Sequence, residues 1–265
     1  MGCFSFVSKI SFKTAATYRA DIWLSILRAL LSLSIQVFLW KAIYSINSEQ
    51  AGLPFQDMVT YLIISAALST ALLDQAPLWD IRNDVRSGNI VTHFSRPYSY
   101  MMNKMAFAIG RSAYKFIFTA IPCVIVASIL FGFSLPQNVP VLLLAIFTSI
   151  SSFVIFFSMY FIFGLTTFWY MDMHGAVPLV LGNFSKVLSG AVIPLWYFPE
   201  WLRNIANTLP VRLGFDLPLS IYFGRINGTA ILSGILIQII WIAALLAISY
   251  ICWFFAARRI VIQGG

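Results

Sequence analysis

The chain contains six runs of mainly apolar residues, each long enough for a helix that crosses a lipid bilayer. They lie at residues 22–46, 58–79, 105–131, 139–168, 173–194 and 229–255. The hydrocarbon core of a bilayer needs about 20 residues of helix, and backbone groups that face lipid must pair within a helix or a closed barrel. Runs this long and continuous do not fit barrel strands. We therefore expect an all-α integral membrane protein with six transmembrane helices.

The composition agrees with lipid as the main solvent of the chain. Hydrophobic residues make up 60% of the 265 residues and charged residues only 10%, whereas an ordinary soluble domain carries about 25% charged residues. The net charge of +8 arises from cations at the ends of the apolar runs. This placement favours membrane lipid, and not nucleic acid, as the partner of those charges. We interpret residues 1–265 as a single transmembrane domain.

The distribution of Lys and Arg predicts the orientation, because cytoplasmic loops carry an excess of these residues. Six spans place both ends of the chain on one side. That side has nine cations, which are Lys9, Lys13, Arg19, Arg82, Arg86, Arg96, Lys104, Arg258 and Arg259. The opposite side has three, which are Arg203, Arg212 and Arg225. Both termini are therefore expected in the cytoplasm, and residues 4–20 are expected to form an amphipathic helix along the cytoplasmic interface.

The fifth run, 173–194, is the weakest of the six, because glycines and Pro178 interrupt it. Residues 195–228 follow, and prolines divide them into short pieces. Within this region, apolar residues recur at helical spacing between Glu200 and Leu209, which predicts a short amphipathic helix. We expect residues 195–228 to form a re-entrant region of short helices on the extracellular side.

Motifs that would make the chain an enzyme are absent from the sequence. It has no G-x-x-x-x-G-K-[ST] loop for binding ATP phosphates, and its two histidines and three cysteines lack metal-ligand spacing. We therefore expect no catalytic residues, metal or cofactor on this chain. Asp74, Asn183 and Lys186 are candidates for a translocation path, since polar groups inside a membrane are costly. The alternative is that Asp74 pairs with a cation and that Lys186 extends to the interface.

Residues 80–104 form the longest cytoplasmic loop. We expect a charged helix from Asp80 to Ser87, a break at Gly88, a short β-prone segment to Phe94, and a turn enforced by Pro97. Such a rigid elbow suits docking onto a soluble ATPase. A solvated loop that follows the positive-inside bias explains the same charges. The cations of the loop are Arg82, Arg86, Arg96 and Lys104.

Two stretches resemble a known family. RSGNIVTHFSRPYSYMMNKMAFAIGR, from residue 86 to 111, resembles the part of ABC type-2 exporter permeases in which "G-x-[IL]" and "L-x-R-P" lead into the third span. Phe94 stands where that pattern has Leu. SGAVIPLWYFPEWLRNIANTLPVRLGFDLPLSIYFGR, from residue 189 to 225, is similar to the family pattern "[IL]-P", "F-P-x-W", "L-P" and "P…G-R" before the last span. The order of these motifs resembles the daunorubicin-resistance-like branch of bacterial ABC transporters.

The resemblance implies a permease subunit of an ATP-driven exporter in the bacterial cytoplasmic membrane. Two copies of a separate ATPase subunit would bind ATP and Mg, and a second permease, identical or similar, would complete a homodimer or heterodimer. The cargo would be an amphipathic or hydrophobic drug, lipid or peptide. The alternatives are an ion-coupled secondary transporter that uses Asp74 or Lys186 and a non-transporting membrane scaffold. The residues expected to couple the chain to the ATPase are Arg82, Asp84, Arg86, Gly88, His93, Phe94, Arg96 and Pro97.

Overall fold

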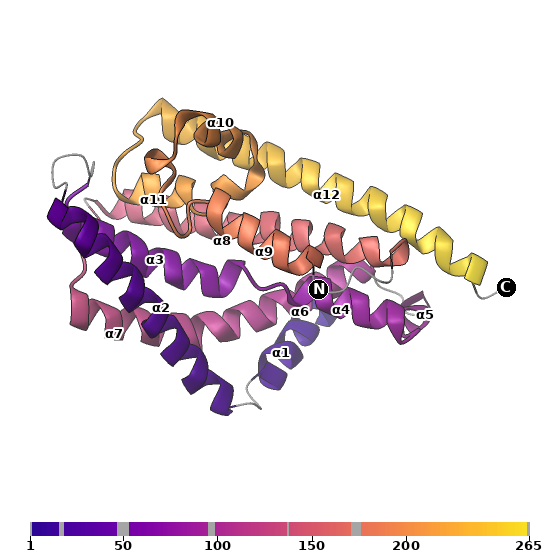
Figure 1. The fold of residues 1–265 in the computed structure, drawn as a ribbon. Coiled ribbons are helices and arrows are strands. Elements are labelled where there is room, and N and C mark those ends of the chain that lie inside the picture. The colour runs from indigo at the N-terminus through magenta and orange to yellow at the C-terminus, as the bar shows by residue number, and fades with distance from the viewer. Residues whose placement is uncertain are drawn as a thin grey trace.

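The computed structural model describes residues 2–15, 19–46, 53–94, 99–136, 138–170 and 176–263, and all regular elements in these residues are helical (Figure 1). Five helical stretches are long and apolar enough to cross a membrane. They are Ile22–Ile46, Phe55–Arg86, Tyr100–Phe131, Val139–Phe168 and Thr229–Arg259. The all-α membrane fold is therefore confirmed, while the sixth span of the sequence prediction is not.

The helices follow one another along the chain with few long connections. In order they are α1 (Gly2–Ala15), α2 (Arg19–Ile46), α3 (Phe55–Leu72), α4 (Ala76–Arg86), α5 (Ile90–Phe94), α6 (Tyr100–Lys115), α7 (Ile121–Phe131), α8 (Val139–Leu165), α9 (Ala176–Leu188), α10 (Glu200–Thr208), α11 (Asp216–Tyr222) and α12 (Thr229–Gln263). A π-helical turn at Phe116–Ala120 joins α6 to α7, and 3-10 turns occur at Thr166–Phe168, Leu195–Tyr197 and Pro210–Gly214.

The second predicted span, 58–79, is two helices and not one. Residues 73–75 interrupt the helix between α3 and α4. Pro77 lies in the first turn of α4, where its missing N–H leaves no hydrogen bond unmade. The Asp74 carboxylate accepts a hydrogen bond of 3.2 Å from the Ala76 amide and so occupies part of the exposed helix start. The break positions α4 as a separate rod beyond the end of α3.

The third stretch begins at Tyr100, earlier than the expected residue 105, and it contains the π-helical turn. Pro122 follows that turn by two residues. A proline within a helix cannot donate to the carbonyl one turn back, and a single π-helical turn accommodates such a local mismatch. The stretch from α6 to α7 therefore crosses the molecule as one irregular rod.

The fifth predicted run forms α9, which has 13 residues. At a rise of about 1.5 Å per residue, α9 is about 20 Å long, which is shorter than the bilayer core of about 30 Å. The turn after α9 is fixed to α3, since Tyr61 donates to the Gly190 carbonyl over 2.6 Å and Ser65 to the Ala191 carbonyl over 2.5 Å. The short amphipathic helix expected after Pro199 is present as α10.

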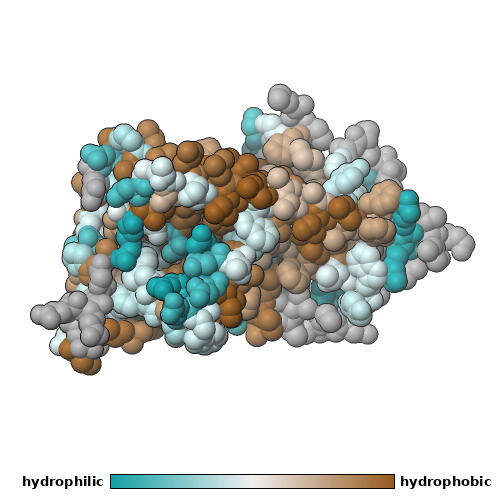
Figure 2. Space-filling model, turned by 90° about the horizontal axis from the view of Figure 1, so that it is seen from above, coloured by the Kyte–Doolittle hydropathy of each residue, from teal (hydrophilic) through white to brown (hydrophobic). Residues whose placement is uncertain are grey.

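The surface of the long helices is strongly apolar. Ile35, Ile129 and Ile150 are 69%, 78% and 68% exposed, and many other large hydrophobic side chains share this exposure. Figure 2 shows a broad area of hydrophobic side chains on one face, with a hydrophilic patch beside it and further hydrophilic side chains near the two ends. An isolated soluble protein rarely exposes apolar patches of this extent. The long apolar helices are therefore the part of the molecule that suits a lipid environment.

Candidate functional site: the helical elbow

The loop between the second and third long stretches forms a folded unit, which we call the elbow. It consists of α4, the turn Ser87–Asn89, α5 and the first turns of α6, and it projects beside the C-terminal end of α12 (Figure 1). Gly88 has a φ angle of +72° and ends α4 as the sequence predicts. The expectation of a β-prone segment after it is wrong. The Val91 amide donates to the Gly88 carbonyl over 3.2 Å, and the Thr92 amide to the Asn89 carbonyl over 3.1 Å, which starts a helix instead.

Asp84 is the polar centre of the elbow. The Lys104 ammonium lies 2.6 Å from its carboxylate, and the Tyr100 hydroxyl donates to it over 2.8 Å. Nε2 of His93 lies 3.5 Å from the same carboxylate oxygen. The side chains of Asp84 and Lys104 are 17% and 9% exposed, so water screens their attraction less than it would on an open surface. Asp84 thereby holds α4, α5 and α6 together.

Aromatic and aliphatic packing attaches this centre to the long helices. The Tyr100 ring stacks on Trp253 of α12, with ring centroids 4.5 Å apart, and its other contacts include an edge-on arrangement with His93 at 4.9 Å. Ile81 and Ile90 are 0% and 4% exposed and belong to the same apolar cluster as Tyr100 and residues of α8. The elbow is therefore a firmly packed extension of the helix bundle.

The exposed part of the elbow is its tip. Arg86, Ser87, Gly88, Asn89, Val91 and Thr92 are exposed. Val91, an apolar residue, is 58% exposed. Arg82 differs from its neighbour Arg86, because it is only 8% exposed and its guanidinium lies 5.2 Å from the centre of the Trp79 ring. The tip offers one cation and one apolar side chain on a rigid support.

The predicted coupling residues therefore separate into three groups. Arg86 and Gly88 lie on the exposed tip, Asp84 and His93 lie in the polar centre, and Arg82 is buried against Trp79. Arg96 and Pro97 lie outside the described residues, and so does the side chain of Phe94.

Two further ion pairs continue from Asp84 toward the membrane. The Asp80 carboxylate lies 3.1 Å from the Arg111 guanidinium, and the Asp74 carboxylate lies 3.1 Å from the Lys115 ammonium. Residues 74–84 and 104–115 run antiparallel, because the last acidic residue of the first segment pairs with the first basic residue of the second. From the sequence we anticipated a cation beside Asp74 as one alternative but did not identify Lys115, and we missed the pair of Asp80 with Arg111. Which acidic residue meets which basic one depends on how α4 and α6 pack, and the spacing along the sequence does not show it.

The predicted path residues lie on two elements, Asp74 at the break between α3 and α4 and the other two on α9. The Asp74 carboxylate is bonded to Lys115 and to the Ala76 amide. Asn183 and Lys186 lie on the exposed side of α9, three residues apart. Within the residues that the structure describes, no group of three or more His, Cys, Asp or Glu side chains is placed to hold a metal ion.

These observations define a multi-pass membrane protein with a rigid polar elbow at one end. A family model described as ABC-2 family transporter protein matches residues 30–264, nearly the whole chain. The chain therefore belongs to the ABC-2 family of transporter proteins. It is the membrane component, in a family whose transport subunits carry no ATPase domain and work with ATPase partners. No curated protein matches the chain significantly.

Proposed function

We propose that the chain is the permease of an ATP-driven exporter and that the elbow is its contact with the ATPase. The observation that carries this proposal is the exposed tip around Arg86 and Val91, held on a packed base whose centre is Asp84. The transport subunits of this family carry no ATPase domain and must receive work from another subunit, and a surface that receives it must be both accessible and rigid. The tip of the elbow meets both conditions.

The base of the elbow offers a route by which movement of the tip reaches the membrane. Tyr100 connects it to α12, Ile81 to α8, and α4 to α3 through the break at residues 73–75. A closing pair of ATPase subunits shifts the transporter only if it binds the tip differently in its open and closed states. We infer that this differential contact is made at the tip and that the rod-like α4 transmits it.

The proposed topology has six crossings with both termini and the elbow in the cytoplasm of a bacterial cell. The fifth crossing consists of α9 and the residues that follow it up to 194, and the short helices α10 and α11 form the re-entrant region at its extracellular end. Figure 1 supports this topology, because α10 and α11 lie at the end of the bundle opposite the elbow and the C-terminus. The nine-to-three distribution of cations supports the orientation.

The proposed assembly contains two ATPase subunits, which bind ATP and Mg, and a second permease of identical or similar sequence. The helix stretch Ile22–Ile46 supports a second permease, since only 11% of its most apolar part is buried within the chain.

The proposed cargo is an amphipathic or hydrophobic drug, lipid or peptide, in accord with the resemblance to the daunorubicin-resistance-like branch. The ion pair of Asp74 with Lys115 gives that carboxylate a structural role, which does not favour an ion-coupled transporter.

The test is charge reversal at the tip, with Arg86→Glu compared with Lys41→Glu. Both side chains are exposed, but Lys41 lies near the far end of α2. The ATPase that copurifies with the wild-type chain is reconstituted with each variant, and its binding and ATP hydrolysis are measured. We expect Arg86→Glu to weaken ATPase binding about tenfold and Lys41→Glu to have no effect. Arg96→Glu and Pro97→Gly are expected to reduce export while assembly is partly retained.

The proposal fails if the Arg86→Glu, Arg96→Glu and Pro97→Gly variants all show wild-type ATPase stimulation and transport. Transport by the purified chain that follows a proton gradient and needs no ATP would support the ion-coupled alternative instead.

A further inference from the structure

A pocket of about 560 Å³ lies between α1, α2 and α6, apart from the elbow. Ser11 and Thr14 line it from α1, and the start of α2 contributes Ile22, Leu24, Ser25 and Arg28. Arg111 and Lys115 come from α6. The walls therefore combine three cations and several hydroxyl groups with apolar side chains at one edge.

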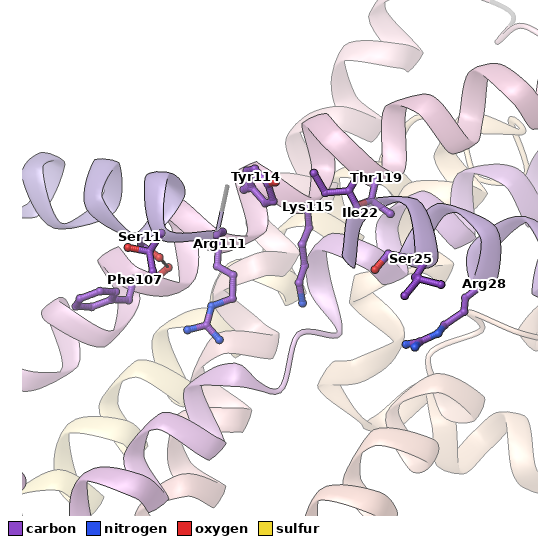
Figure 3. Close-up of a pocket in the computed structure, with 12 residues that line it drawn as sticks. Ser11, Ile22, Ser25, Arg28, Phe107, Arg111, Tyr114, Lys115 and Thr119 are labelled. Carbon is purple, nitrogen blue, oxygen red and sulfur yellow. Dashed lines mark hydrogen bonds between the residues drawn. The ribbon is translucent and has the colours of Figure 1, made fainter. Parts of the chain in front are cut away.

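The three cations point to a common side of the pocket. Figure 3 shows Arg111, Lys115 and Arg28 extending in the same direction from α6 and α2. Arg111 is paired with Asp80 and Lys115 with Asp74. Arg28 differs, because no acidic side chain in the described part of the chain forms an ion pair with it. Among the side chains that the structure describes, the two carboxylates therefore balance Arg111 and Lys115, and Arg28 is the cation of this pocket that no ion pair balances.

Arg28 lies at an unusual position for an uncompensated charge. It is exposed on α2, and its neighbours Leu24, Leu27 and Leu31 on that helix are 50%, 54% and 56% exposed. From Arg28 to Ile46 at the end of α2, the helix rises about 27 Å, close to the thickness of about 30 Å of a hydrocarbon core. Arg28 therefore lies near one boundary of that core, where the phosphates of the lipids begin. An arginine at this depth is stabilised by a phosphate, with which it forms bidentate hydrogen bonds.

We propose that this pocket binds the phosphate of an anionic phospholipid head group, with Arg28 as the main contact and Arg111 and Lys115 beside it. The hydroxyl groups of Ser25 and Thr119 are available to the polar part of the head group, and the exposed side chains of Leu31 and Ile35, which follow Arg28 along α2 toward the membrane core, flank the start of the acyl chains. A free phosphate ion shares the same chemistry and lacks only the apolar part. The proposal is independent of the transport function, because it concerns binding alone.

The experiment measures lipid binding to the purified full-length chain in detergent by native mass spectrometry. Phosphatidylglycerol, phosphatidylcholine and inorganic phosphate are titrated separately onto the wild type and the variants Arg28→Gln and Lys41→Gln. The two variants are matched, since each removes one exposed positive charge from α2. We expect phosphatidylglycerol to bind more tightly than phosphatidylcholine, and Arg28→Gln to weaken phosphatidylglycerol about tenfold while Lys41→Gln leaves it unchanged.

Several outcomes would overturn the proposal. One is equal binding of phosphatidylglycerol and phosphatidylcholine, and another is an equal loss of phosphatidylglycerol in both variants. A third is binding of inorganic phosphate that depends on Arg28 without any preference for phosphatidylglycerol, which would assign the pocket to a soluble anion. The thermal unfolding midpoint of each variant confirms that it is folded. None of these results depends on ATPase binding, so they are separate from the test of the transport function.

Discussion

At the scale of single residues, Asp84 has the largest expected effect on stability. Asp84→Asn retains an oxygen for the Tyr100 hydroxyl but removes the negative charge opposite Lys104, whose side chain is 9% exposed. An ammonium left without its counter-charge in a nearly buried site is strongly destabilising. Because the pair retains some contact with solvent, we expect a loss of about 2 kcal/mol, which corresponds to a decrease of about 5 °C in the unfolding midpoint.

The measurement for Asp84→Asn is thermal unfolding of the purified chain in one detergent. Glu200→Gln is the matched control, since it also neutralises one carboxylate, at the exposed start of α10. The control is expected to unfold within about 1 °C of the wild type. Equal midpoints for the two variants would show that Asp84 does not hold the elbow together.

Substitutions of Gly88 measure the cost of a left-handed backbone without a steric clash. Its φ angle is +72°, and a Cβ atom added to it would meet nothing within 4 Å. The cost of Gly88→Ala is therefore the left-handed backbone alone, about 1 kcal/mol, while Gly88→Asn costs less because Asn tolerates this conformation. We expect unfolding midpoints in the order wild type, Asn, Ala, and a variant with Ala as stable as the wild type would contradict the turn geometry.

At the scale of helices, α1 is attached to α6 by a close approach at Gly110. A Cβ atom there would collide with the Ser8 carbonyl oxygen and would lie 2.9 Å from the Ser11 Cβ. Ser11 also donates to the Phe107 carbonyl over 2.7 Å, and Phe12 packs edge-on against Tyr114. The sequence predicts this helix, within residues 4–20, from its apolar and basic residues. The docking of α1 on α6 depends on the absence of a side chain at Gly110, and the hydrophobic periodicity of the sequence does not reveal this.

Gly110→Val is therefore expected to displace α1 from α6. Limited trypsin digestion measures the displacement, because Lys9 is an exposed cleavage site on α1. We expect cleavage after Lys9 to accelerate about tenfold, as local opening becomes easier by about 1.4 kcal/mol. Met102→Val, at a position of α6 that is 51% exposed, is the control and should leave the rate unchanged. An unchanged rate in Gly110→Val would show that α1 is not held by this contact.

The sequence could predict elements that depend on hydrophobic periodicity, but not those that depend on contacts between particular side chains. Four long apolar runs gave spans close to the observed ones, because lipid requires about 20 continuous apolar residues and little else. The run at 58–79 hid a break, since Asp74 and Pro77 disturb the helix without lowering its average hydrophobicity much. The charges and Gly88 indicated a helix followed by a break, and α4 and the turn after it have this form. The polar centre of the elbow could not be predicted. The cation that pairs with Asp84 is decided by the way α4 packs on α6, and the sequence does not show this packing.

At the scale of the whole molecule, the remaining question is which end faces the cytoplasm. Figure 1 shows α5 and the C-terminus at one end of the bundle, with α10 and α11 at the other. The cations of α4 and of the last turns of α12 lie at the first end, and Arg203 of α10 lies at the other. An odd number of crossings would separate the termini, whereas the proposed six keep them on one side. The topology and the orientation are therefore tested together by labelling one position at each end.

Single cysteines at Asn89 in the elbow and Asn204 in α10 provide this test, because both side chains are exposed. The native Cys3, Cys123 and Cys252 are first replaced by Ala. A membrane-impermeant thiol reagent added to intact cells should label Asn204→Cys fully and Asn89→Cys only after permeabilisation. The physical reason is the cost of moving the Lys and Arg side chains near the elbow across the bilayer. Labelling of Asn89→Cys in intact cells would show that the orientation is the reverse of the proposed one and that no cytoplasmic ATPase can reach the elbow.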